Sequence, residues 1–358
     1  MPEYVDALLS EASAYSDRYG HPAMETAFIG GGTPSLLPAE LMNRLFSGLR
    51  GYFDIPSGIE LTSEANPGTL TEEWLEVAVA GGVNRLSLGM QAYQPEMLRT
   101  IGRIHDFSQV IHSVRMARKA GIANINLDLM FGLPGQTADM WKETLETALS
   151  LEPEHLSCYG LIPEDGTPLK ADLDEKRLSL PDEDTERRMY DDALRILEKH
   201  GYKQYEISNF ALPGYECRHN MGYWRQVPYL GLGVAAASCV PCGEGMSYTR
   251  LANPADLSSY FTMVKRSDWN MRESTPVSPA DARFETMMLG LRTTEGVSEA
   301  SFLAMHGLSL TACYGRRLRT LEDRGLIIWQ DGRCRLTRRG MDVQNTVLVE
   351  LMDDESAS

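Results

Sequence analysis

Short apolar runs alternate with amphipathic helical runs over the first 210 residues, and this alternation constrains the fold more than any other feature. The expected strands span 26–32, 59–66, 85–91, 124–132 and 155–162. Thr69 and Glu72 have the spacing of a capping box before one of the intervening helices. Repeated strand–helix units predict parallel strands with right-handed crossovers. The chain is therefore expected to contain an α/β domain built on a parallel sheet.

Polar residues or glycines end four of these strands in succession. They are Gly31–Thr33, Glu64 with Asn66, Gln91, and Asp128. The carboxyl ends of parallel strands meet at one rim, where α/β proteins bind their ligands. We therefore expect a ligand site on this rim. The glycine run "AFIGGGTPSLL" lacks the pattern GxxxxGK[ST], so it is not a phosphate-binding P-loop.

The strand–helix alternation ends near residue 163, and the rest of the chain is organised differently. After a Ser-, Pro- and Asp-rich join near 267–281, three helical patterns precede a short hairpin around "QDGR". This order is typical of a winged-helix-like domain. The predicted domains are a barrel core over 1–165, an extension over 166–266, and a C-terminal winged-helix-like domain over 267–358.

The charge of the chain argues against general nucleic-acid binding. The net charge is −16, whereas contact with phosphates needs positive charge. Residues 311–340 depart from this balance, with eight arginines and three acidic residues. DNA binding by this segment is one interpretation, and contact with the carboxylates of a ligand or of an acidic partner protein is another. With no apolar run of 18 residues and no signal peptide, we expect a cytoplasmic protein without a transmembrane segment.

Six cysteines are too few for a disulfide framework in a chain of 358 residues. Cys239 and Cys242, in "CVPC", fall in an expected loop and are either a metal or redox pair or two unrelated thiols. Cys158 lies within an expected strand and is predicted to be a core residue. Cys313 and Cys334 are assigned to the core of the C-terminal domain.

Five motifs occur in order along the chain: "FIGGGTPSLL", "SEANPGTL", "RLSLGMQAYQPEMLRTIGRIH", "NINLDLMFGLPGQT" and "YEISNFALPGYECRHNMGYW". Together they resemble the radical SAM proteins related to oxygen-independent coproporphyrinogen III oxidase, and more narrowly their haem-chaperone branch, the HemW type. The resemblance runs from about residue 3 to 350. It implies a partial (β/α)6 barrel that binds S-adenosylmethionine across its strand ends.

The resemblance also implies a 4Fe–4S cluster held by a CxxxCxxC motif after the first barrel strand. This sequence contains no CxxxCxxC, so the barrel is expected to lack its first strand, and the cluster cysteines would precede Met1. A misassigned start codon, an incomplete gene and a natural protein without a cluster are the three explanations. No metal ligand is expected in this chain. The strand at 26–32 would then be a sheet edge, open to pairing with another chain.

The motifs assign the S-adenosylmethionine contacts to residues at the strand ends: Gly31, Gly32, Thr33, Glu64, Gln91, Arg103 and Asp128. The glycines would face the methionine end, and Glu64 would accept hydrogen bonds from the amine or the ribose. The other three positions contact a second S-adenosylmethionine in the oxidase. For Arg103 and Asp128 the alternative is a salt bridge on the rim. For Gln91 it is a hydrogen bond that closes a strand end.

The segment "HNMGYW" over 219–224 is the signal specific to the haem-chaperone branch. A neutral imidazole is a good axial ligand of haem iron, and aromatic rings stack on a porphyrin. His219 is therefore the candidate haem ligand, and a buried histidine bonded to a carbonyl is the alternative. Cys217 is either a second ligand or a buried thiol. Of the other histidines, His105 is near the rim and either lines the pocket or is structural, and His155 is expected to be structural.

The resemblance implies a haem chaperone of radical SAM ancestry, which binds haem and passes it to an acceptor protein. The alternative is a radical SAM oxidoreductase that decarboxylates coproporphyrinogen III. "HNMGYW" and the short C-terminal part favour the chaperone, so an active oxidase is not expected. The expected partners are haem, a haem-acceptor protein and, in a dimer, a second copy of the chain.

Overall fold

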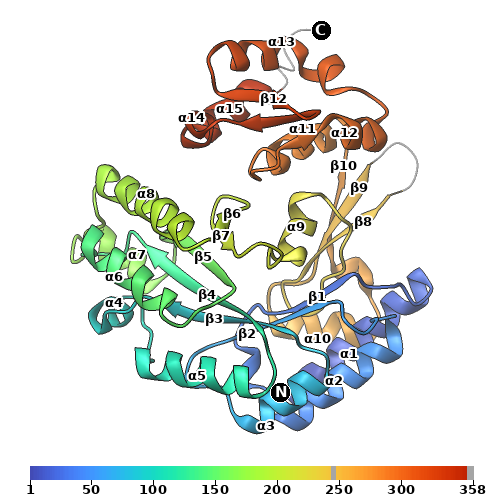
Figure 1. Ribbon diagram of the computed structural model, residues 1–358. Helices are drawn as coiled ribbons and strands as arrows, with labels where there is room; N and C mark the ends of the chain where they lie inside the picture. The colour runs from blue at the N-terminus through green and yellow to red at the C-terminus, as the bar shows by residue number, and fades with distance from the viewer. Residues whose placement is uncertain (243–246, 353–358) are drawn as a thin grey trace. The chain divides into compact units, whose positions relative to one another are not determined.

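A seven-stranded sheet organises the first part of the chain (Figure 1). The strands lie in the order β1-β2-β3-β4-β5-β7-β6. Strands β1 to β5 are parallel, and β7 and β6 are antiparallel additions. The bounds are Thr26–Ile29 for β1, Glu60–Ala65 for β2, Arg85–Gln91 for β3, Asn124–Phe131 for β4, His155–Gly160 for β5, Lys203–Gln204 for β6 and Asn209–Ala211 for β7. All five expected strands are therefore confirmed, with β1 at one end of the order.

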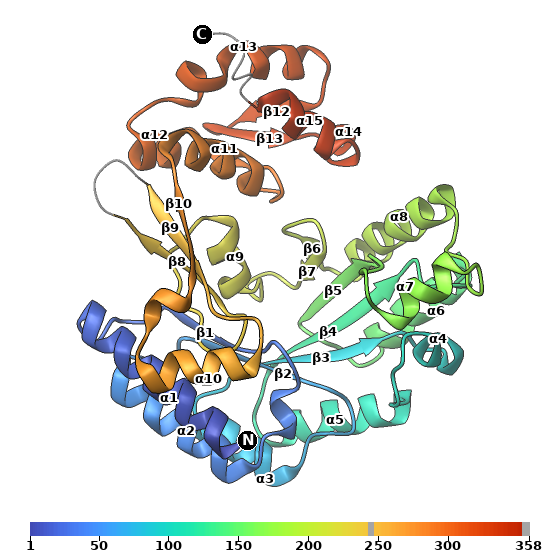
Figure 2. The same ribbon diagram turned by 180° about the vertical axis from the view of Figure 1, so that it is seen from behind.

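Helices connect these strands, as the alternating pattern predicts. Figures 1 and 2 show α2, α3 and α5 along one face of the sheet. On α6, the indole nitrogen Nε1 of Trp141 donates a 2.7 Å hydrogen bond to the carbonyl oxygen of Met189 on α8. The bounds are Pro2–Tyr19 for α1, Pro34–Leu36 for η1, Ala39–Tyr52 for α2, Glu72–Ala80 for α3, Pro95–Thr100 for α4, Phe107–Lys119 for α5, Ala138–Leu149 for α6, Pro168–Asp174 for α7 and Glu183–Lys199 for α8.

The expected capping box of α3 is wrong. The N-cap is Thr71, whose side chain accepts a hydrogen bond from the backbone nitrogen of Trp74 at 3.1 Å. Thr69 instead donates from its hydroxyl to the carbonyl oxygen of Asn66 at 2.7 Å, and it lies 2.5 Å from the hydroxyl of Ser35. Thr69 and Thr71 both precede the acidic first turn of α3, so their distance in sequence from the glutamates does not show which of them is the N-cap.

The two faces of the sheet differ in chemistry because side chains alternate along each strand. On β3, Leu86 and Leu88 are fully buried on the face that packs beneath the helices. Arg85 and Ser87 point to the opposite face, which we call the inner face, and there Asn126 of β4 donates a 2.7 Å hydrogen bond to Ser87. The inner face is therefore lined by polar side chains although it is largely shielded from solvent.

A second, antiparallel sheet follows, with the order β10-β9-β8. The prediction of an irregular join near 267–281 is wrong in part, because strand β10 lies within it. The prediction of a loop at "CVPC" is also wrong in part, because Cys239 lies in β8. In β10 only Val277 is buried, so the strand shows no apolar alternation, and its edge position tolerates Pro276. The bounds are Arg218–Trp224 for α9, Ala237–Pro241 for β8, Tyr248–Ala252 for β9, Leu257–Arg266 for α10, Trp269–Met271 for η2 and Glu273–Val277 for β10.

The C-terminal region has the three helices and the hairpin that the sequence predicts. Strands β11, β13 and β12 form an antiparallel sheet in that order. Phe302, Leu318 and Cys334 are buried in its core, and Cys313 packs against them, as expected. The bounds are Pro279–Gly290 for α11, Val297–Ser298 for β11, Glu299–His306 for α12, Leu310–Asp323 for α13, Ile327–Gln330 for β12, Arg333–Leu336 for β13, Arg338–Asp342 for α14 and Gln344–Leu351 for α15.

The computed structural model describes residues 1–242 and 247–352, and their contacts divide into two units. The sheet unit comprises residues 1–5, 13–204 and 208–219, and the C-terminal unit comprises 6–12, 205–207 and the described residues from 220 onward. The expected boundaries after residues 165 and 266 stay a prediction. None of the described helices is long and apolar enough to cross a membrane.

Candidate functional site

The glycines after β1 bring backbone close to the carboxyl group of Glu64. A Cβ on Gly30 would lie 2.6 Å from the ring of Phe28 and 2.7 Å from the carboxyl carbon of Glu64, so only glycine fits there. The backbone nitrogen of Gly31 donates a 3.2 Å hydrogen bond to Oε2 of Glu64. Gly31 has φ 78°, and a Cβ on Gly31 or Gly32 would meet no atom of the described residues within 4 Å. This exposed backbone is open to a ligand beside a carboxylate.

Asn66 links two of the predicted rim residues. Its side-chain nitrogen Nδ2 donates to the hydroxyl of Thr33 at 3.0 Å, and its oxygen Oδ1 accepts from Nη1 of Arg103 at 3.4 Å. No ion pair joins Arg103 to Asp128 within the described residues, so the alternative of a rim salt bridge is wrong. The structure instead gathers Thr33, Asn66 and Arg103 into one polar chain.

Asp128 is held by neutral donors on the inner face. The hydroxyl of Ser87 donates to its Oδ2 at 2.9 Å, and Nδ2 of Asn126 donates to its Oδ1 at 2.8 Å. Burial raises the pKa of Asp128. Burial, and then the charge of Asp128, also raises the pKa of Glu64, against the effect of the Gly31 N–H group. Two neighbouring carboxyl groups that are costly to ionise favour a cationic ligand, which would relieve both.

Gln91 ends β3 with a strained backbone. Its φ is 64°, in the left-handed region that side chains other than those of glycine, asparagine and aspartate rarely adopt. A Cβ on Gly89 would lie 2.9 Å from Nε2 of Gln91, so the small residue makes room for this side chain. Nowhere in the described chain does the Gln91 side chain form a recorded hydrogen bond, so the alternative of a strand-closing bond gains no support. Backbone strain of this kind concentrates at ligand sites.

Glu60 on β2 holds the start of the "HNMGYW" segment, and the sequence reasoning missed it. Its carboxylate accepts hydrogen bonds from the backbone nitrogens of Arg218 and His219, both at 2.9 Å. The thiol of Cys217 donates to Oε1 of Glu60 at 3.4 Å, and Cys217 is fully buried. Glu60 thus supplies the acceptors that the first turn of α9 needs. For Cys217 the structure supports the interpretation as a buried thiol.

The imidazole of His219 lies against β1. Its Nδ1 is 2.9 Å from the hydroxyl of Thr26, and its ring stacks on Phe28 with centroids 5.3 Å apart and an interplanar angle of 25°. Burial lowers the pKa of His219, against the opposing charge of Glu60, so the ring is neutral at neutral pH. A neutral ring fixed through Nδ1 is in the state that metal ligation requires. Thr26 was also missed, although it lies in an expected strand.

His105 and His155 hold polar groups within the fold. Nδ1 of His155 is 2.6 Å from Oδ1 of Asn126, and His155 is fully buried, which confirms its structural role. Nε2 of His105 is 3.2 Å from the carbonyl oxygen of Met90, and His105 is also buried. His105 therefore supports the end of β3 from the protein side.

The cysteines do not assemble a cluster site. Cys239 lies in the extended strand β8, and three residues of strand span about 10 Å, beyond the Cα separation of about 4.4–6.8 Å that a disulfide needs. Burial raises the pKa of Cys239, which disfavours a reactive thiolate. In the parts of the chain that the structure describes, no three His, Cys, Asp or Glu side chains are placed to hold a metal ion. The described residues therefore do not fit a 4Fe–4S cluster.

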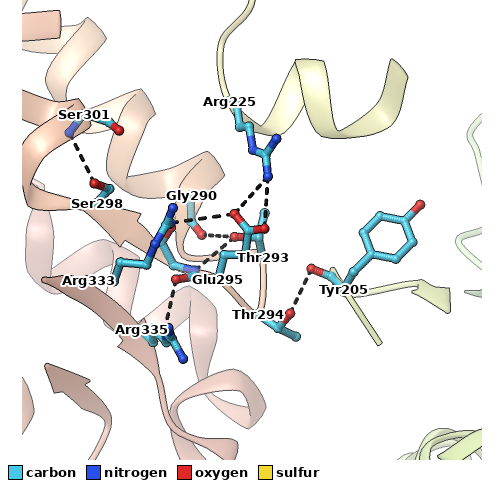
Figure 3. Close-up of polar contacts among 11 residues, drawn as sticks. Tyr205, Arg225, Gly290, Thr293, Thr294, Glu295, Ser298, Ser301, Arg333 and Arg335 are labelled. Atoms are coloured by element: carbon cyan, nitrogen blue, oxygen red, sulfur yellow. Dashed lines mark hydrogen bonds and ion pairs between the residues drawn. The ribbon is translucent and has the colours of Figure 1, made fainter. Parts of the chain in front are cut away.

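Most of the C-terminal arginines are engaged within their own unit. Arg225 donates to both carboxylate oxygens of Glu295, at 3.0 and 2.9 Å, and Arg333 lies 3.7 Å from the same carboxylate (Figure 3). Arg324 and Arg338 pair with Glu350 and Asp342. Arg317, Arg335 and Arg339 donate to backbone carbonyl oxygens. Two arginines of the predicted basic segment, Arg316 and Arg319, are exposed and form no ion pair or side-chain hydrogen bond with the described residues.

Comparison with known proteins identifies the relatives of this chain. Residues 5–148 match the Radical SAM superfamily, and residues 277–343 match the HemN C-terminal domain. Heme chaperone HemW of Bacillus subtilis is 37% identical over 346 residues, which cover 96% of this chain and 90% of that protein. The chain belongs to the HemW family. Heme chaperone HemW of Escherichia coli is 34% identical over 308 residues, covering 86% of this chain and 78% of that protein.

A solved structure shows the same fold. Coproporphyrinogen III oxidase (HemN) of Escherichia coli, a radical SAM enzyme, superposes with a TM-score of 0.81 and 22% identity. The match covers 97% of this chain and 82% of that chain. The predicted radical SAM fold with a separate C-terminal domain is therefore confirmed for this HemW family member.

Proposed function

We propose that this chain is a haem chaperone that binds haem through His219 and passes it to an acceptor protein. The observation that supports this most directly is the placement of His219, whose neutral ring is held by Thr26, Phe28 and the Glu60-capped turn. Two contacts on the imidazole and one on the backbone nitrogen of His219 fix its position before any ligand arrives, which lowers the ordering cost of binding. The membership in the HemW family makes haem the ligand to test first.

We further propose that the rim binds S-adenosylmethionine, for which its residues have suitable chemistry. When bound, S-adenosylmethionine supplies a sulfonium cation and an amino-acid group. The exposed backbone at Gly31 and Gly32 would contact the amino-acid group, and Glu64 would accept from the amine. Asp128 adds negative charge, and Thr33, Gln91 and Arg103 complete the proposed set. Since the described residues do not fit a 4Fe–4S cluster, no step of the proposal depends on one.

The partners follow from the same proposal. Haem and a haem-acceptor protein are required, and a homodimer and a cytoplasmic location stay predictions. We do not expect nucleic-acid binding, because most arginines of the basic segment are engaged within the C-terminal unit.

Haem titration followed by absorbance tests the ligand. The chain should give a Soret band that His219→Ala shifts or loses and that added imidazole restores. His112→Ala, which removes an exposed histidine on α5, is the matched control and should leave the band unchanged. An unchanged Soret band in His219→Ala would reject His219 as the ligand.

The alternative activity has its own test. Anaerobic incubation of coproporphyrinogen III with the chain, S-adenosylmethionine and a reductant should yield no decarboxylated product. Product formation would contradict the interpretation as a chaperone alone and favour the oxidoreductase.

A further inference from the structure

Arg85 is a buried arginine with no hydrogen-bonded or ion-paired partner among the described residues. It opens β3, points to the inner face, and is 2% exposed. Among the described residues, no hydrogen bond or ion pair to its guanidinium group is recorded, and Nε is shielded from solvent. Arginine stays protonated at every pH a protein meets, so the charge cannot be removed by proton loss.

Two neighbours of Arg85 also have buried polar atoms that lack a hydrogen-bond partner among the described residues. In the strand register, Arg85 is paired with Thr62 of β2 on one side and with Asn124 of β4 on the other. The hydroxyl of Thr62 and Oδ1 of Asn124 are both buried, and neither has a hydrogen-bond partner in the part of the chain that the structure describes. Three orphaned polar groups therefore form one row across three adjacent strands, at the amino ends of β3 and β4.

The carboxylates of the inner face already accept hydrogen bonds from other groups, although the charge of Arg85 acts on Asp128 and lowers its pKa against the effect of burial. Both oxygens of Glu60 accept hydrogen bonds from the turn at 217–219, and both oxygens of Asp128 accept from Ser87 and Asn126. The positive charge of Arg85 disfavours protonation of His155 and His219, whose pKa values are lowered mainly by burial. Buried polar groups in folded proteins nearly always find a partner, so a row of orphans marks a missing one.

We propose that Arg85, Thr62 and Asn124 bind a small oxyanion, either a carboxylate or an inorganic phosphate group. The guanidinium group presents a fork of N–H donors that matches two oxygens of such an anion. The Thr62 hydroxyl adds a donor, and the Asn124 amide does so through Nδ2 after rotation of the side chain. Asn124 is only half-buried, which gives the row an edge near solvent. This site is at the opposite ends of the strands from the rim.

Thermal unfolding of the full chain tests the proposal. Sodium formate and sodium phosphate are compared with sodium chloride at equal ionic strength. The midpoint should rise with formate or phosphate and saturate, as expected for a ligand of the folded state. Formate alone would indicate a planar carboxylate site, and phosphate alone a tetrahedral one. Arg85→Met should lose the response and, in chloride, should unfold no more easily than the parent chain.

Arg99→Met, at an exposed arginine of α4, is the matched control and should respond like the parent chain. A response no larger than that to chloride, or an equal response in Arg85→Met, would overturn the proposal. If Arg85→Met does not fold, Thr62→Val and Asn124→Leu replace it in calorimetric titrations with formate and phosphate. Each should weaken binding about tenfold, and unchanged affinity in both would overturn the proposal.

Discussion

Arg85 in the sheet unit and Arg272 in the C-terminal unit are both buried arginines, yet their surroundings are opposite. Arg272 donates to Oε1 of Glu11 at 2.7 Å and to Oδ1 of Asn253 at 2.8 Å, and it lies 4.6 Å from the ring centre of Trp269. The side chain of Glu11 is fully buried and also accepts from Gly233. The protein therefore gives one buried charge direct hydrogen-bonded partners, whereas the other meets the charge of Asp128 with no hydrogen bond or ion pair among the described residues. A directly paired charge belongs to the fold, and one without such a partner indicates a ligand.

Of the substitutions that test this comparison, Arg272→Met should lower the free energy of unfolding the most. Removing Arg272 leaves the Glu11 carboxylate buried without its counter-charge, which should cost about 3–5 kcal/mol of unfolding free energy. Urea unfolding followed by circular dichroism measures it. Arg266→Met, at an exposed position on α10, should change stability by less than about 0.5 kcal/mol. A loss below about 1 kcal/mol would show that Glu11 and Arg272 are not the compensated pair described.

Glu64→Gln examines a carboxyl group that is only partly compensated. The variant removes the charge that would face a cationic ligand, so S-adenosylmethionine binding should weaken about 10- to 100-fold, which is about 1.4–2.8 kcal/mol. Isothermal titration calorimetry measures the affinity, with Glu40→Gln on α2 as the exposed control. Equal affinity in Glu64→Gln would remove Glu64 from the site.

The same carboxyl group predicts a pH dependence. Because the pKa of Glu64 is raised in the folded chain, that state retains a proton at pH values where the unfolded chain has lost it. The contribution of Glu64 to the free energy of unfolding without ligand should therefore fall as the pH rises from about 4 through the raised pKa. Urea unfolding measures the free energy of unfolding of the parent chain and of Glu64→Gln across this range. The difference, parent minus variant, should fall as the pH rises, and a constant difference would contradict the raised pKa.

Glu60→Gln tests the support of His219. The amide retains one acceptor but loses the charge that holds the first turn of α9, so stability should fall by about 1–2 kcal/mol. The Soret band should broaden or shift, because the imidazole loses its fixed position, and Glu73→Gln on α3 is the exposed control. A stability loss with an unchanged haem spectrum would leave Glu60 with a purely structural role.

The smallest effect is expected for Arg225 and Glu295, which pair at the surface of the C-terminal unit. Their side chains are 57% and 45% exposed, so solvent screens the attraction. A double-mutant cycle with Arg225→Ala and Glu295→Ala should give a coupling of about 0.2–1 kcal/mol that shrinks with added salt. A coupling above about 2 kcal/mol would show that this pair stabilises the fold as a buried ion pair does, like Arg272 with Glu11.

Local pattern was enough to predict the strands and the rim, because apolar runs and strand-end glycines are visible in the sequence. Strand β10 was missed since an exposed edge strand carries no such pattern. Glu60, Thr26 and Arg85 were missed for another reason. Each lies inside an expected strand, where alternation alone does not say which side chains meet across the inner face. Their roles depend on register and on the return of the chain at 217–219, which bring together residues more than 150 positions apart.

The left-handed backbone of Gln91 has a consequence for how the chain tolerates change. A glycine at 91 would relax the turn and add to thermal resistance while deleting the side chain that faces the rim. Selection for heat tolerance alone would therefore favour a substitution that selection for cofactor use would reject. Thermal stability and cofactor binding thus favour different residues at position 91. Libraries screened separately for each property should select different residues there first.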